Sequence, residues 1–403
     1  MSGDQRVQPS GALNGLTVIE LGDGTAAPFA AKMLGDFGAE VIKVEGPEGD
    51  STRRRGPFPD GKPDPEASGL FLYLNINKLG VVLDVSTDHG RSTMQRLLAG
   101  ADVFVTNLPI DRLRSAGLAP ETLRSRLPRL IIATVSPFGS NGPWAARRGD
   151  ELISFATGGI AYSTPGMPDA SDDLYREPPL HPTCFAAETM TGLACATAIM
   201  AAVNGRELTG QGCHIDISQQ AAVASMQIRD VMNSSYGDTR YNRLLNPITI
   251  GRMPNFYLPC KDGYVTIAAP MDIHWDRLVE GMGEPAWAKS ADYASSAART
   301  ANWIALRDKL IEWTMTLTGD ELHALAEKSQ LPIFPFYSIR KMAESEHARV
   351  RRTLVEVELG GRKARMPAAP VGMRATPWAM RYPAPRLGEH SDLVLRERLG
   401  VTA

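Results

Sequence analysis

Hydrophobic and polar positions in the first fifty residues follow the pattern of a strand, a helix and a second strand. Thr17–Leu21 alternates around β-branched residues, which is typical of a strand. Residues 22–24 break it, and apolar residues at helical spacing follow over 26–37. Gly38 ends this helix, and Glu40–Glu45 reads as the second strand. We therefore predict a βαβ unit with a ligand-binding crevice beyond the C-terminal ends of its strands.

The same alternation continues through the first half of the chain. Further strands are predicted at 81–85, 102–106, 130–135 and 213–218. Helices are predicted between them at 89–99, 111–116, 120–126 and 150–157. A stretch rich in small residues, 185–203, is predicted to be a long interior helix. Strands alternating with helices indicate an α/β fold with a doubly wound parallel sheet.

The pattern changes after residue 233 and indicates a second, smaller α/β domain. Polar, turn-rich residues 234–253 are predicted to be a linker, and a strand at 263–269 opens the smaller unit. Its helices are predicted at 274–282, 301–316 and 319–329, with strand material at 354–359 and a final helix near 392–399. We expect a large Rossmann-like domain over 1–233, the small domain over 254–340, and a C-terminal segment, 341–403, that returns to the large domain.

Composition excludes several classes of protein. A hydrophobic content of 43%, a charged content of 22% and a net charge of −2 describe an ordinary soluble protein, with no expected nucleic-acid or membrane partner. No apolar run is expected to span a membrane, and residues 1–10 have no signal-peptide core, so we expect a cytoplasmic protein. The four cysteines and seven histidines lack metal-ligand spacings, so no metal is expected.

Two patterns near the first strand suggest binding of phosphates. Residues 22–27 fit a dinucleotide fingerprint with alanine in the third small position, but the competing interpretation is a tight turn that allows close packing. Arg53, Arg54 and Arg55 lie in the loop after the second strand. We interpret these arginines as a solvated face, ahead of a phosphate contact.

Short motifs, in order over nearly the whole chain, resemble those of family III CoA-transferases. They include LNGL, GAEVIKVE, GD, NINK, TGQG, PCKDGY and LGEHSD at 13–16, 38–45, 49–50, 75–78, 209–212, 259–264 and 387–392. This family includes formyl-CoA:oxalate and carnitine CoA-transferases, and α-methylacyl-CoA racemase is a relative. The resemblance implies two-domain subunits that interlink like rings in a homodimer. It also implies acyl-CoA and a carboxylic acid as substrates, with coenzyme A in place of a nicotinamide.

The resemblance further implies which residues meet CoA. Asn107 matches a CoA-contacting asparagine, Arg148 matches a basic CoA-contacting position, and Lys78 is a candidate for the phosphates. The opening loop is expected to contact CoA through Asp23, Gly24, Thr25 and Ala26.

Three positions depart from formyl-CoA transferases. Gly46, Leu108 and Ser115 stand where those enzymes carry an arginine, an aromatic residue and another arginine. We therefore expect an acyl group bulkier than formyl or oxalyl.

Glu188 lies at the position where the family carries its nucleophilic aspartate. In the first turn of a helix, the N-terminal amides are expected to lower its pKa, keep it ionised and hold the oxyanion of each intermediate. The carboxylate can then attack an acyl-CoA thioester and become an enzyme glutamyl-CoA thioester. The competing interpretation is a glutamate that only stabilises the helix.

Two neighbouring acidic residues complete the predicted catalytic set. Glu151 matches an active-site glutamate and is expected to orient or protonate the reacting acid, unless it is a surface cap beside Arg147 and Arg148. Racemase relatives carry a histidine at the position of Asp150, so an Asp150/Glu188 pair that moves an α-proton is our second hypothesis. A catalytically silent CoA-binding subunit of a paired transferase is the third, and a nicotinamide oxidoreductase is the least favoured.

Overall fold

The structure is a computed structural model that describes residues 11–164, 180–236, 253–359 and 362–401. It divides into two compact units, which are treated separately. The first holds described residues within Met1–Tyr162, Leu180–Met232 and Arg352–Ala403, and the second those within Ser163–Pro179 and Asn233–Arg351. The predicted linker, 234–253, lies mostly outside the described residues, and the predicted domain boundaries stay predictions.

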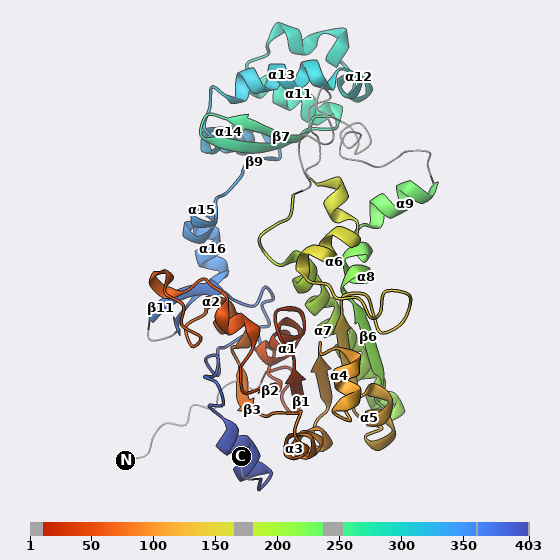
Figure 1. Ribbon diagram of the computed structural model, residues 1–403. Helices are drawn as coiled ribbons and strands as arrows, with labels where there is room; N and C mark the ends of the chain where they lie inside the picture. Colours follow the sequence, from red (N-terminus) through yellow and green to blue (C-terminus); the bar gives the residue numbers. More distant parts are fainter. Residues whose placement is uncertain (1–10, 165–179, 237–252, 360–361, 402–403) are drawn as a thin grey trace. The chain divides into compact units, whose positions relative to one another are not determined.

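A parallel six-stranded sheet forms the centre of the first unit, in the order β3-β2-β1-β4-β5-β6 (Figure 1). Val18 of β1 pairs with Val41 of β2 on one side and with Val103 of β4 on the other. This confirms the predicted α/β class with a parallel sheet. The strands are β1 Thr17–Leu21, β2 Glu40–Glu45, β3 Lys78–Val82, β4 Val103–Thr106, β5 Ile131–Ser136 and β6 His214–Ser218.

Helices cover both faces of this sheet. Neighbouring residues of a strand point to opposite sides, and here apolar side chains point to both sides and are buried by helices on each. Val18 and Val41 belong to a core cluster with α1 and α7, whereas Ile19 and Ile42 belong to one with α3, α4, α5 and the C-terminal helix η6. These helices are α1 Ala26–Asp36, α3 Asp88–Ala99, α4 Ile110–Ser115, α5 Pro120–Arg126, α7 Ala186–Thr209 and η6 Asp392–Arg398. The remaining helices are α2 Gly69–Asn75, α6 Glu151–Thr157, α8 Gln219–Ser225 and α9 Ile228–Tyr236.

Two sequence predictions about this unit need correction. The third strand begins at Lys78, three residues before the predicted start. The prediction missed this start because a lysine is not expected in a buried strand, yet Lys78 is fully buried. Helix α7 is long and apolar enough to cross a membrane by length and composition, contrary to our expectation for the chain. It nevertheless lies in this fold with Cys195 and Ile199 buried against the sheet layer, while Leu193 and Leu208 are exposed, so only one face is interior.

The C-terminal part of the first unit, within Arg352–Ala403, contacts the sheet. It begins with an antiparallel hairpin of β10 Leu354–Leu359 and β11 Arg362–Pro367. Arg381 then donates hydrogen bonds to the carbonyl group of Gly35, in the last turn of α1, and to those of Gly38 and Ala39, which follow the helix. The segment reaches the edge strand where the Gly80 amide donates to His390 Nδ1.

The second unit is built on a three-stranded antiparallel sheet, β7-β8-β9. Val265 and Ile267 of β8 pack against Trp275, Leu306 and Leu322 from three helices. Its strands are β7 Asn255–Cys260, β8 Gly263–Ala268 and β9 Ile333–Pro335. Its helices are α11 Asp272–Gly281, α12 Ser296–Ala301, α13 Trp303–Thr314, α14 Gly319–Ser329, α15 Ile339–Glu344 and α16 Glu346–Arg351.

Candidate active site

The loops after β1 and β4 meet beyond the C-terminal ends of these neighbouring strands. The Asp23 amide donates to Asn107 Oδ1 at 2.9 Å, and Asn107 Nδ2 donates to the Asp23 carbonyl at 2.6 Å. Gly24 has a φ of 76°, a conformation that favours glycine. Because the strand order reverses between β1 and β4, this is the point where ligands bind in open parallel sheets. Asn107 therefore fixes the predicted opening loop there, and its contact with CoA stays a prediction.

Helices α1 and α7 approach each other closely at Gly192. A Cβ atom on Gly192 would lie 2.7 Å from the Ala26 carbonyl oxygen and 2.9 Å from the Phe29 ring. Glu188 lies one helical turn before Gly192, on the same face of α7. The close packing therefore brings the Glu188 carboxyl group beside Thr25, at the start of α1.

The carboxylate of Glu151 caps the N-terminus of α7. It accepts the amide of Ala187 at 3.0 Å and the amide of Glu188 at 2.8 Å. His181 Nε2 lies 3.0 Å from the same carboxylate, and its ring packs edge-on against Phe155. Glu151 is only 8% exposed, so the alternative of a surface cap is wrong. No sequence motif pointed to His181, because a contact across thirty residues depends on the fold.

The pKa of Glu188 is shifted in the direction opposite to our prediction. The α7 amides that were expected to keep it ionised donate to Glu151 instead. Burial raises the pKa of the Glu188 carboxyl above its ordinary value, and the charges of Glu151 and Asp150 raise it further. The Thr25 hydroxyl and the Arg55 charge lower it in part.

Two buried oxygen atoms in this site have no hydrogen-bond partner among the described residues. They are Glu188 Oε2 and Thr25 Oγ1. Thr25 is 2% exposed, yet its hydroxyl faces the Glu188 carboxylate closely enough to affect the pKa of that group. Polar atoms left unpaired inside a protein are uncommon and are a feature of functional sites. A carboxylate and a hydroxyl therefore remain available to a ligand.

Asp150 and Arg148 lie on the loop that enters α6. Asp150 Oδ1 accepts the Ile153 amide at 3.1 Å and so caps α6, and its charge still acts on Glu188. Arg148 is exposed on the same loop. The structure thus brings the three predicted acidic residues, Asp150, Glu151 and Glu188, into one cluster, and the contact of Arg148 with CoA stays a prediction.

Lys78 is wholly buried. Its ammonium group donates to Glu20 at 2.7 Å, to the Pro28 carbonyl at 2.8 Å and to Asn75 at 2.9 Å. An ammonium group has three donors, so none is left for a phosphate. The same network continues through Lys43, which contacts Glu20 and Asp50, and Asp50 Oδ1 lies 3.4 Å from the Gly24 amide of the opening loop.

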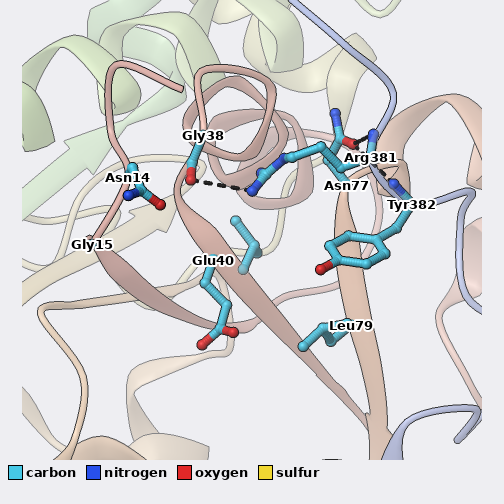
Figure 2. A pocket seen from close by; sticks show the side chains of 9 residues that line it. Asn14, Gly15, Gly38, Glu40, Asn77, Leu79, Arg381 and Tyr382 are labelled. Carbon is cyan, nitrogen blue, oxygen red and sulfur yellow. Dashed lines mark hydrogen bonds between the residues drawn. The ribbon is translucent and has the colours of Figure 1, made fainter. Parts of the chain in front are cut away.

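A cavity lies at the N-terminal ends of the strands. It has a volume of about 200 Å³ and is lined by residues that include Glu40, Leu79 and Arg381 (Figure 2). Glu40 begins β2 and Leu79 is the second residue of β3. The cavity is therefore separate from the Glu188 cluster, which lies at the C-terminal edge. Within the described ranges, no group of three or more His, Cys, Asp or Glu residues is arranged to hold a metal ion.

The chain belongs to CoA-transferase family III, whose model matches residues 13–391. The resemblance stated from the sequence is thereby confirmed, and the protein is a CoA-transferase.

Individual relatives agree with this family. The chain is 32% identical to the succinyl-CoA–L-malate CoA-transferase beta subunit of Chloroflexus aurantiacus, over 96% of this chain and 94% of that one. It is equally similar, at 32%, to the succinate–glutarate CoA-transferase of Agrobacterium fabrum, over 96% and 95%. The crystal structure of a CAIB/BAIF family protein from Brucella suis matches with a TM-score of 0.84 at 29% identity, over 96% and 99%.

Proposed function

We propose that this enzyme moves CoA from an acyl-CoA to a carboxylic acid through a glutamyl-CoA thioester on Glu188. The observation that carries this proposal is a buried Glu188 oxygen that has no hydrogen-bond partner in the described ranges. It lies beside the Thr25 hydroxyl, which likewise has none there, at the edge of the sheet where ligands bind. Glu188 also matches the position of the family's nucleophilic aspartate.

The proposed reaction consists of acyl transfers that need no external oxidant or metal. A Glu188 carboxylate oxygen attacks the thioester carbonyl, and the C–S bond breaks. CoA departs as a thiolate, and the acyl group and Glu188 are then joined in a mixed anhydride. The thiolate then attacks the glutamyl carbonyl, which releases the donor acid and leaves CoA on Glu188. The acceptor carboxylate reverses these steps, so acyl-CoA is formed and the Glu188 carboxylate is restored.

The surroundings of Glu188 suit a reactive nucleophile. Burial and two nearby negative charges destabilise the carboxylate, which favours its conversion to a neutral thioester. Since the α7 amides are engaged by Glu151, the Thr25 hydroxyl is the better candidate to donate to the oxyanion. This assignment replaces the amide oxyanion site expected from the sequence.

Trapping of the covalent intermediate tests the proposal. After incubation with an acyl-CoA, hydroxylamine or borohydride should modify Glu188, as read by peptide mass spectrometry. Glu188→Gln should abolish both trapping and transfer. Glu207→Gln changes an exposed glutamate at the far end of α7 and serves as the control. A Glu188→Gln enzyme that still turns over would exclude this mechanism.

Proton exchange at the α-carbon of an acyl-CoA is the second candidate function. It draws support from the action of the Asp150 charge on Glu188, which requires the two carboxylates to be near each other. Such an enzyme would incorporate deuterium from heavy water into an acyl-CoA without any acceptor acid. Strict dependence on an acceptor would exclude it.

An interlinked homodimer in the cytoplasm is the proposed form of the enzyme. Large apolar side chains remain exposed along α7–α9, where a second subunit would cover them, for example Leu193, Leu208 and Ile228. Because one relative is named as a beta subunit, an unlike partner chain is the alternative. Native mass spectrometry of the purified chain, together with its activity, distinguishes a working homodimer from a silent subunit.

A further inference from the structure

Three consecutive arginines after β2 have three different environments. Arg53 is 2% exposed and donates from Nε and Nη2 to the two Glu45 oxygens, each at 2.8 Å. Arg54 is exposed and donates to the Glu48 carbonyl at 2.7 Å. Arg55 is exposed, and no acceptor for its guanidinium group is found in the described part of the chain. The sequence interpretation of all three as a solvated face is wrong for Arg53.

The backbone of Arg55 is held firmly, in contrast to its exposed side chain. Its amide donates to the Thr52 carbonyl at 3.0 Å, which closes the short helix η1, Ser51–Arg54. Its carbonyl accepts the hydroxyl of Ser68, a fully buried residue, at 2.5 Å. The guanidinium group is therefore presented from a fixed anchor point.

Hydrogen bonds tie this segment to the turn that precedes α1. The Ser51 amide donates to Asp23 Oδ1 at 2.6 Å, and the Gly24 amide lies 3.4 Å from Asp50 Oδ1. The next residue after this turn is Thr25, which faces the Glu188 carboxylate. Because the positive charge of Arg55 lowers the pKa of Glu188, the guanidinium group lies near the reacting carboxyl group.

An unpaired guanidinium group beside a reacting centre suits an anionic part of the substrate. The phosphates of CoA are separated from its sulfur by the long pantetheine arm, so they lie far from Glu188 when the thioester is there. The acyl chain, in contrast, starts at the thioester carbonyl. A second carboxylate on a short acyl chain therefore falls in the region of Arg55. Succinate, malate and glutarate, which the names of two relatives mention, each carry two carboxylates.

We propose that Arg55 binds the distal carboxylate of a dicarboxylic acyl group and thereby selects diacids over monoacids of equal length. This inference rests on the proposed function, because it takes Glu188 as the position of the thioester. It names dicarboxylic acids as the substrate class. A hydrogen-bonded ion pair of this kind predicts a preference of about tenfold to hundredfold in binding.

Binding measurements in the Glu188→Gln background test this inference without requiring turnover. Calorimetry should show that this protein binds succinyl-CoA about tenfold to hundredfold more tightly than butyryl-CoA, which has nearly the same shape and no second charge. Adding Arg55→Gln should weaken the binding of succinyl-CoA by that factor and leave the affinity for butyryl-CoA unchanged. Arg55→Lys should retain part of the preference, and Arg54→Gln, the matched control, should retain all of it.

Each other outcome has a definite meaning. If the protein shows no preference for succinyl-CoA, the inference is overturned, because Arg55 then does not bind a distal carboxylate. If Arg55→Gln weakens the binding of both thioesters equally, it is also overturned, because Arg55 then contacts the CoA moiety that they share. A preference that persists in Arg55→Gln would overturn it as well. If the preference depends on Arg55 but Glu188 of the unmodified enzyme never acquires CoA in the trapping experiment, the inference stands and the proposed covalent mechanism fails.

Discussion

The Glu151 carboxylate accepts the backbone amide of Glu188 at 2.8 Å, so one glutamate caps the helix that presents the other. The cap also accepts the Ala187 amide, so neither of these two amides is free to bind a ligand. The negative charge of Glu151 therefore lies next to the proposed nucleophile, whose pKa it helps to raise. This relationship makes the ionisation of Glu188 depend on the charge of Glu151.

Glu151→Gln is expected to move the pH dependence of the reaction. Because the Glu151 charge raises the pKa of Glu188, its removal lowers that pKa, and the acid limb of kcat/KM shifts to lower pH. The weakened cap should also reduce the free energy of unfolding by about 1–3 kcal/mol. A pH–rate profile and urea denaturation measure the two effects. An unmoved acid limb would contradict the coupling, and Glu207→Gln provides the control.

Thr25→Val is expected to shift the acid limb the other way. The Thr25 hydroxyl lowers the pKa of Glu188, so its loss raises that pKa and activity disappears at a higher pH than in the unmodified enzyme. If the hydroxyl donates to the oxyanion, kcat should also fall about a hundredfold. Thr25→Ser keeps the hydroxyl and should retain most of the rate. Equal losses in the two variants would assign Thr25 to packing alone.

Gly192→Ala is expected to reduce activity by moving α7. The added Cβ would lie 2.7 Å from the Ala26 carbonyl oxygen, so α7 must shift away from α1 and take Glu188 with it. A displacement of about 1 Å at a reacting atom can cost a hundredfold in rate. Gly205→Ala in the same helix meets no atom within 4 Å and should leave kcat unchanged. Steady-state kinetics of both variants, with their melting temperatures, check this prediction.

Lys78→Met is expected to destabilise the fold and to change how stability varies with pH. Loss of a buried charged partner of Glu20 should cost about 3 kcal/mol of unfolding free energy. Burial lowers the pKa of Lys78 to about 8, from an ordinary value of 10.5. Between pH 8 and pH 10.5 the unfolded chain binds more protons than the folded one, so the free energy of unfolding rises with pH through this window. This contribution to stability is lost as the pH falls through 8. Denaturation curves at several pH values should show this rise in the unmodified enzyme and not in the variant.

Much of the fold could be predicted from local patterns. The predicted bounds of the first two strands agree with β1 and β2, because alternating β-branched residues bounded by glycine leave few alternatives. The third strand was placed too late, because a strand that begins with a buried lysine does not resemble an apolar run. The parallel sheet followed from the alternation of strand and helix, whereas the strand order β3-β2-β1-β4-β5-β6 became known only from the structure.

The sequence by itself determined the α/β class and the family, and it singled out Glu188 as the candidate nucleophile, since these depend on residue types in order along the chain. The tertiary structure decided what surrounds that glutamate. Glu151 takes the α7 amides, Thr25 and Arg55 approach from segments more than 130 residues away, and burial reverses the expected shift in pKa. Desolvation and charge act through space, and they become known only when distant segments are brought together.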